Sequence, residues 1–272
     1  MSLKNLLDRL YKEVHQPEFI SADPVQFLHR YKKRQDQEIA AFLAATIAWG
    51  RRDLIIKSAE KMFALMDNSP YSFVMNGDYR RLKNRNIHRT FFEDDLKYFC
   101  RGFKACYELC DTIEEIFAPV SNKLTGVSNK PTDIWEGISR FREVMARANK
   151  GLYSKHISSP GANSACKRLN LALRWLVRRE GPVDLGLWQR ISPASLFIPL
   201  DIHVGRSARH LGLLDRKSND KKAVIALTEK LREFCPQDPV KYDFALFGFS
   251  NFYPVNPGVK EPAPVDQTLH AR

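Results

Sequence analysis

SSPGANSACKRLN, residues 158–170, and IPLDIHVGRSARHLGLL, residues 198–214, carry the strongest structural signals of this sequence. The first motif is a turn followed by Lys167, which we expect in the first turn of a helix. Gly161 lets the backbone approach a ligand closely, and the N–H groups at a helix start form an anion site. In the second motif, Asp201 stands where an N-cap belongs, before an amphipathic helix that ends at Gly212. The two motifs therefore predict two helices, one that starts with the amine of Lys167 and one that starts with the carboxylate of Asp201.

Helical spacing of apolar residues extends over most of the chain. Apolar residues recur three and four positions apart in 39–47, 169–176 and 224–231. We find no hairpin of alternating strands, no repeat and no low-complexity tract. Residues 256–272 lose this spacing and contain three prolines, so we expect an irregular tail there. The sequence predicts an all-α fold.

The composition favours a polyanionic partner. Lys and Arg number 43 against 31 Asp and Glu, and the resulting net charge of +12 excludes an acidic solvating protein. No apolar run is long enough to span a membrane, and the N-terminus has the pattern of an amphipathic helix rather than of a signal peptide. Five cysteines, an odd number, do not suggest a disulfide framework. We therefore expect a cytoplasmic protein.

The positive charge is concentrated in residues 140–179, which carry ten basic side chains and one acidic one. We interpret this stretch as a nucleic-acid contact. About five phosphate contacts would give a slope of roughly −4.5 for log K against log salt. The smaller basic clusters in 30–34 and 80–89 we interpret as solvated faces. Binding to a membrane surface is disfavoured, because the arginines of the helix starting at Lys167 share it with core-like leucines.

A glycine turn, a helix that begins with lysine, and then D-x-H-V-x-R with a downstream L-G together resemble the helix-hairpin-helix (HhH-GPD) DNA glycosylase superfamily. The similarity is closest to the archaeal-type 8-oxoguanine DNA glycosylases, in which the hairpin lysine and the aspartate are similarly far apart in sequence. The whole chain also looks like a related bacterial family of uncharacterised function. The resemblance implies that residues 1–255 form a single glycosylase-like unit of two helical lobes with a cleft between them. It places the hairpin and the catalytic motif at 158–215.

The resemblance implies a bifunctional glycosylase with abasic-site lyase activity on oxidised purines, with 8-oxoguanine as the expected lesion. Lys167 would attack the anomeric carbon and form a Schiff base, and Asp201 would stabilise the developing positive charge and handle protons. The target base would be flipped out of the duplex. The implied partner is double-stranded DNA with a damaged base, at the nucleoid. No cofactor, metal, membrane or protein partner is implied.

Two further segments resemble parts of the superfamily. Residues 38–55 look like an early helix that ends in a DNA-intruding loop, here 49–52, and residues 241–249 look like the C-terminal helix that closes over the extruded base. The base pocket implied by this likeness consists of Trp49, Asp243 at the base edge and Phe247 at the ring face. The implied contacts to the DNA backbone are made by Gly161, Ser164, Arg168, His203 and Arg206.

The sequence also departs from the family pattern. Gly161 stands alone where the hairpin usually has two glycines, and Lys167 lies six residues further on. The four-cysteine iron–sulfur signature of one branch is absent. These departures favour the alternative of a non-catalytic module that binds DNA or RNA. Asp184 is an alternative to Asp201 as the catalytic acid, because it follows the lysine at a spacing nearer to that of enzymes with a shorter hairpin.

Overall fold

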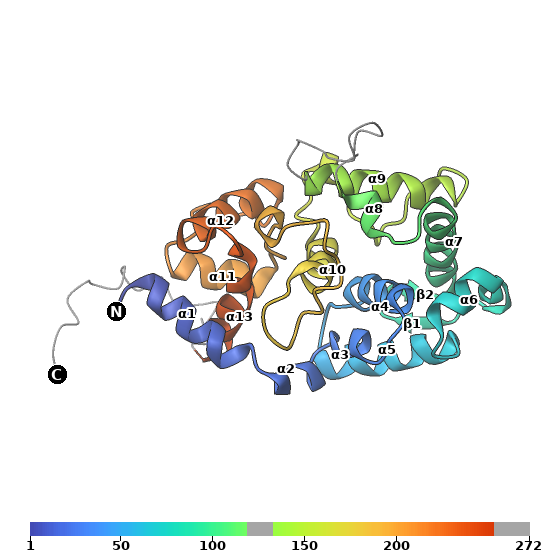
Figure 1. The fold of residues 1–272 in the computed structure, drawn as a ribbon, viewed down its shortest axis with the longest axis horizontal. Helices are drawn as coiled ribbons and strands as arrows, with labels where there is room; N and C mark the ends of the chain where they lie inside the picture. Colours follow the sequence, from blue (N-terminus) through green and yellow to red (C-terminus); the bar gives the residue numbers. More distant parts are fainter. Residues whose placement is uncertain (119–132, 253–272) are drawn as a thin grey trace.

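A computed structural model describes residues 1–118 and 133–252, so the predicted tail at 256–272 lies outside the described residues. The described chain is mainly α-helical, as the sequence predicts (Figure 1). Its α-helices are α1 (Leu3–Val14), α2 (Pro17–Ser21), α3 (Gln26–His29), α4 (Arg34–Thr46), α5 (Arg52–Leu65), α6 (Pro70–Asn76), α7 (Glu93–Leu109), α8 (Glu114–Phe117), α9 (Ile134–Arg147), α10 (Lys167–Val177), α11 (Ile202–His210), α12 (Lys221–Phe234) and α13 (Tyr242–Phe252). Short 3₁₀ helices are η1 (Asp78–Arg81), η2 (Pro160–Ala162), η3 (Pro193–Ser195) and η4 (Pro239–Lys241).

The helices form two groups, with α10 between them (Figure 1). On one side, α1 and α11 both pack against α13. On the other side, α4 packs on α3 and α6, and α9 packs on α7 and α8, while α10 packs on α4. One continuous cluster of buried apolar side chains extends through both groups and includes the predicted core residues Trp175 and Trp188. The two groups therefore share a core.

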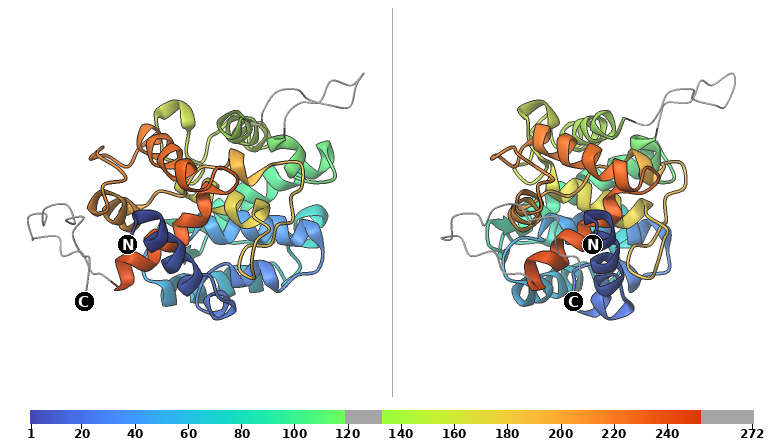
Figure 2. Two further views of the ribbon diagram at one scale, coloured as in Figure 1. Left: turned by 60° about the vertical axis from the view of Figure 1, so that its left-hand side comes forward. Right: turned by 90° about the vertical axis from the view of Figure 1, so that its left-hand side faces the viewer.

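The first and last described helices lie side by side, as both views of Figure 2 show. Asp8 of α1 accepts a hydrogen bond of 3.0 Å from the Tyr242 hydroxyl and forms an ion pair of 3.1 Å with Lys241. Because α13 carries both Asp243 and Phe247, its contact with α1 fixes the position of two predicted site residues.

A short β-hairpin corrects the prediction that the chain contains no strand pair. Strand β1 (Asn86–His88) pairs antiparallel with β2 (Phe91–Phe92). Strands of three and two residues are too short to show the alternation of apolar and polar residues by which a strand is recognised. His88 connects this hairpin to its neighbours: its Nε2 donates to the Trp49 carbonyl at 3.0 Å, which leaves Nδ1 to accept from the Ser58 hydroxyl at 2.9 Å.

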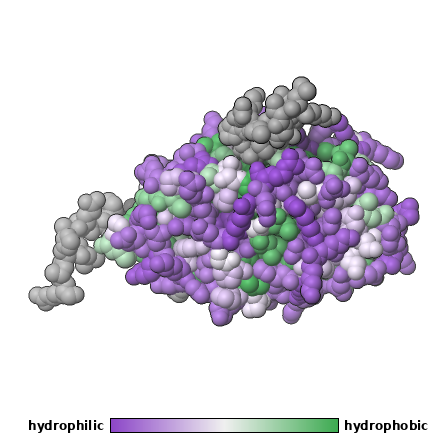
Figure 3. All heavy atoms as spheres, viewed as in Figure 1, coloured by the Kyte–Doolittle hydropathy of each residue, from purple (hydrophilic) through white to green (hydrophobic). Residues whose placement is uncertain are grey.

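The surface of the face shown in Figure 1 is mainly hydrophilic, with an apolar patch near its centre (Figure 3). None of the helices within the described ranges is long and apolar enough to cross a membrane.

Candidate active site

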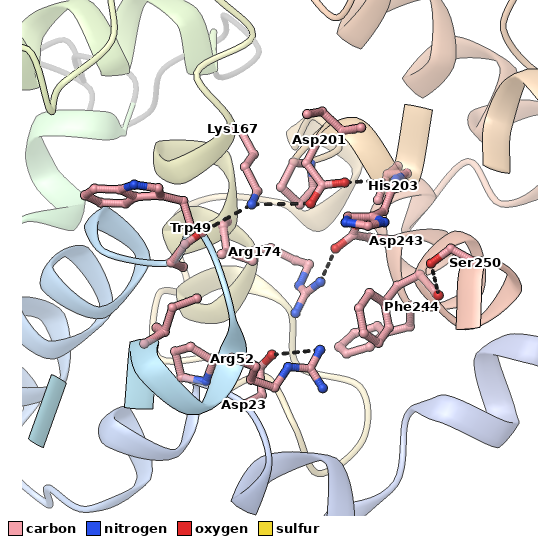
Figure 4. A pocket seen from close by; sticks show the side chains of 18 of the residues that line it. Asp23, Trp49, Arg52, Lys167, Arg174, Asp201, His203, Asp243, Phe244 and Ser250 are labelled. Atoms are coloured by element: carbon pink, nitrogen blue, oxygen red, sulfur yellow. Dashed lines mark hydrogen bonds and ion pairs between the residues drawn. The ribbon is translucent and has the colours of Figure 1, made fainter. Parts of the chain in front are cut away.

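A cavity of about 560 Å³ lies where the two groups of helices meet (Figure 4). Its walls are the loop between α4 and α5, one face of α10, the first turn of α11 and one face of α13. Residues of α2 and of the segment before α3 also line it. Sites for small molecules and cofactors commonly have volumes of about 300–1,000 Å³. The cavity is therefore large enough for a ligand the size of a nucleoside.

Lys167 is the first residue of α10, as the sequence predicts, and its side chain reaches into the cavity. Its Nζ lies 3.3 Å from Oδ2 of Asp201 and donates to the Ala48 carbonyl at 3.3 Å. The side chains of the two ionic partners are 30% and 29% exposed. The amine is thus held in one place and remains reachable by a ligand.

Asp201 combines a structural contact with its contact to the amine. It is the N-cap of α11, where Oδ1 accepts a hydrogen bond of 2.9 Å from the backbone N–H of Val204. That bond leaves Oδ2 directed at Lys167. An N-cap carboxylate is held in one orientation by the helix it caps. Lys167 and Asp201 therefore face the same cavity.

Asp184, the alternative acid, lies elsewhere in the fold. Its side chain is fully buried and forms ion pairs with Arg174, at 3.3 Å, and with Arg178. A carboxylate neutralised by two buried guanidinium groups cannot serve a substrate without breaking that cluster. The carboxylate beside Lys167 is therefore that of Asp201.

The same buried cluster corrects the interpretation of residues 140–179 as one exposed basic field. Arg178 is fully buried, and its Nε donates to Asp238 at 2.9 Å. Burial lowers the pKa of Arg178, but its ion pairs with Asp184 and Asp238 outweigh that effect and raise it. Arg174 also lies in the cluster. Acids that are distant in the sequence therefore neutralise part of this charge inside the protein.

Asp243 brings a second carboxylate to the cavity. Its Oδ2 accepts from Arg174, whereas Oδ1 is buried and has no hydrogen-bond partner within the described ranges (Figure 4). Burial raises the pKa of Asp243 to about 6; the charge of Arg174 opposes this rise and that of Asp201 adds to it. An unpartnered buried oxygen is a candidate contact for a ligand, because leaving it unsatisfied costs free energy.

Phe247 lies one helical turn from Asp243 and also lines the cavity. Its ring face is already in contact with a cation: the guanidinium of Arg52 lies 4.9 Å from the ring centroid, and Phe19 meets the ring edge at 5.9 Å. Arg52 also lies 3.9 Å from Asp23. A planar ligand that stacks on Phe247 from the side of Arg52 would have to displace that guanidinium.

Trp49 lines the cavity but is fixed in place. Its ring meets His88 edge-on at 4.9 Å and stacks on His156 at 6.0 Å, and the Arg168 guanidinium lies 5.1 Å from it. This packing does not fit a side chain that intrudes into DNA. In the same loop Arg51 is exposed: its side chain is 76% exposed and pairs with Asp53.

Of the residues predicted to contact the DNA backbone, three are accessible in the structure. His203 lines the cavity, and Arg206 is exposed on the same helix. Gly161 is exposed in η2, but the left-handed conformations of this turn belong to Asn163 and Cys166, at φ 55° and 47°. The glycine is therefore not needed to make the turn.

The other two predicted backbone contacts are engaged in the fold. The Ser164 hydroxyl accepts from the Cys166 N–H at 3.2 Å. Arg168 donates to the Thr46 carbonyl at the end of α4, at 3.0 Å, and burial lowers its pKa. Arg168 holds α4 rather than extending into solvent, so a phosphate contact would break this bond.

Sequence reasoning missed Arg52, Asp23 and Arg174 as components of the cavity. Arg174 had a usable signal, because Arg178 follows it by four positions and so shares its helix face. Arg52 belongs to the predicted loop 49–52, but no feature of the sequence relates it or Asp23 to α13, because that relation depends on the tertiary fold. No group of His, Cys, Asp and Glu in residues 1–118 and 133–252 has the arrangement of a metal site.

A family model described as a protein of unknown function, DUF2400, matches residues 23–252, and the chain belongs to this family. The match contains the residues that line the cavity, except Phe19 of α2. No curated protein and no solved structure matches the chain.

Proposed function

We propose that this member of the DUF2400 family is a helix-hairpin-helix DNA glycosylase with abasic-site lyase activity on oxidised purines, 8-oxoguanine first among them. The observation that supports this most is the placement of the Lys167 amine 3.3 Å from the Asp201 carboxylate at a cavity between two groups of helices. In the proposal these groups are the two lobes, and damaged double-stranded DNA binds across the cleft between them.

The pair of side chains suits the chemistry of glycosidic cleavage. Asp201 would accept a proton from the Lys167 ammonium, and the free amine would then attack the anomeric carbon of the sugar. The new bond joins nitrogen to carbon, the bond from carbon to the base breaks, and the base leaves with the electron pair and takes up a proton. The product of this displacement is an aminal. Breakage of its C1′–O4′ bond, with a proton passing from the nitrogen to the ring oxygen, opens the sugar and gives the Schiff base, and loss of a C2′ proton then permits elimination of the 3′ phosphate.

The remaining walls suit an extruded base. Oδ1 of Asp243 offers an unused acceptor for an N–H at the edge of a purine, and Phe247 offers an apolar ring once Arg52 has moved. Flipping a nucleotide out of a duplex costs a few kcal/mol, least where the base is damaged or mispaired. The gap that the extruded base leaves in the duplex would be filled by the exposed Arg51 guanidinium, since the Trp49 ring of the same loop is fixed in the fold.

Borohydride trapping on a duplex with one abasic site tests the proposal. The wild-type protein should be linked covalently to the DNA, and Lys167→Ala should abolish the linkage while leaving binding within a few-fold. Lys155→Ala, which removes an exposed lysine that does not line the cavity, is the matched control and should trap as the wild type does. Undiminished trapping by Lys167→Ala would overturn the assignment.

The alternative function is a non-catalytic nucleic-acid-binding module. The turn before Lys167 favours it, because its left-handed residues are Asn163 and Cys166 and it therefore differs from a hairpin built on two glycines. It predicts no base or strand scission on a panel of lesions, together with binding that weakens steeply with salt.

A further inference from the structure

The basic cluster in residues 80–89 is not accounted for by the cavity. It contains five Lys and Arg side chains and no acid. In the structure the segment runs from the end of η1 through β1 to the turn of the hairpin, and β1 packs along α5. Two contacts fix this arrangement: His88 with Ser58 at 2.9 Å, and Lys61 Nζ with the Asn86 carbonyl at 2.5 Å.

The turn of this hairpin reaches the loop at the edge of the cavity. Arg89 has a left-handed φ of 50° at the turn, and its guanidinium lies over Gly50, which lines the cavity. A Cβ atom added to Gly50 would lie 2.8 Å from Nη1 of Arg89. The C-terminal end of the basic segment therefore lies against the proposed DNA-intruding loop.

A second hollow lies at the other end of α5. It has a volume of about 420 Å³ and is lined by Ala64, Leu65, Arg81, Leu82, Lys83 and Arg85. Two of its three cations are paired, Arg81 with Asp67 and Arg85 with Glu93. Lys83 is exposed and has no acidic partner among the residues that the structure describes.

Helix α5 sets the distance between the two sites. It runs from Arg52 at the cavity to Leu65 at the second hollow. At 1.5 Å per residue this separation is about 20 Å. Since the bases of one strand of B-DNA are spaced about 3.4 Å apart along the axis, it corresponds to roughly six base pairs. Lys57 and Lys61 are exposed between the two ends.

We infer that a basic ridge, defined as Lys57, Lys61, Arg81, Lys83, Arg85 and Arg89, binds the phosphate backbone of the duplex arm that flanks the cavity. This inference rests on the proposed function, because the cavity is taken as the position of the reacting nucleotide. The ridge orients the duplex along α5 without reading its sequence, since phosphate contacts position a protein on DNA but do not specify bases.

The test measures binding of the full chain to an abasic-site duplex by fluorescence anisotropy over a range of salt concentrations. The double variant Lys83→Gln/Arg89→Gln removes two exposed cations that form no ion pair within the described ranges. Its slope of log K against log salt should be shallower by about 1.8, because each phosphate that is no longer neutralised reduces the slope by about 0.9. The control Lys12→Gln/Lys32→Gln makes the same charge change at exposed positions outside the ridge and should keep the wild-type slope.

A second duplex, whose arms end about three base pairs from the abasic site, is too short to reach the second hollow. On it the Lys83→Gln/Arg89→Gln variant should lose less affinity than it does on the long duplex. Equal salt slopes for wild type and variant on the long duplex would overturn the inference that the ridge binds DNA, even if borohydride trapping succeeds. Failure of trapping with a reduced slope in the variant would overturn the catalytic proposal and leave the ridge standing.

Discussion

Replacing Asp243 with Asn measures what it costs to ionise a carboxyl group in the wall of the cavity. Burial raises the pKa of Asp243 from 3.8 to about 6, so the folded chain holds this proton at pH values where the unfolded chain has released it. Stability is therefore lost as the pH rises from about 4 to 6, and the loss stays constant above that range. A shift of about two pKa units corresponds to about 3 kcal/mol, of which about 2 kcal/mol falls between pH 4.5 and 7.5.

Asparagine has the shape of the aspartate and no charge, so Asp243→Asn should escape this loss. The substitution also changes the contact with Arg174, so the test, by urea unfolding of both proteins, is the change with pH: between pH 4.5 and pH 7.5 the variant should gain about 2 kcal/mol in its free energy of unfolding relative to the wild type. Asp215→Asn, at an exposed position, is the control and should follow the wild-type pH profile. Parallel profiles for wild type and Asp243→Asn, or a variant that loses relative stability as the pH rises, would refute the reasoning.

Two matched pairs of variants test other parts of the structure. Asp201→Asn should lose borohydride trapping while the free energy of unfolding changes by less than about 1 kcal/mol, because Asn is also a good N-cap. Asp184→Asn should lower the free energy of unfolding by about 3 kcal/mol, because buried guanidinium groups lose a partner. Equal melting temperatures for Asp201→Asn and Asp184→Asn would contradict this. Gly102→Ala should cost about 1–3 kcal/mol, since the added Cβ would lie 2.1 Å from the Met145 sulfur. Gly161→Ala, which meets one side-chain oxygen at 3.6 Å, should change stability by less than about 0.5 kcal/mol in urea unfolding.

The parts of the fold that the sequence predicts correctly are those with local signals. The helix after Asp201 carries its own cap, its own apolar stripe and a glycine at its end, where Gly212 adopts φ 66°. Lys167 at the start of α10 is predictable for the same reason, because the turn-forming residues before it mark where the helix begins. That the amine and the carboxylate meet did not follow from spacing alone and required the resemblance.

The parts that could not be predicted depend on partners far apart in the sequence. Arg178 is buried because Asp184 and Asp238 neutralise it, and the second of these lies sixty positions away. Trp49 is fixed because His88 and a second histidine pack on its ring, although neither is near it in the sequence. Charge counted along a stretch of sequence therefore overstates the charge at the surface.

The contact between α1 and α13 has a consequence for biosynthesis. The apolar face of α1 leaves the ribosome before the helix it packs against has been made, and every other described element separates the two. Such non-local contacts form late and slow the folding of a chain. Because α13 is also one wall of the cavity, the cavity is complete only after α13 has docked on α1.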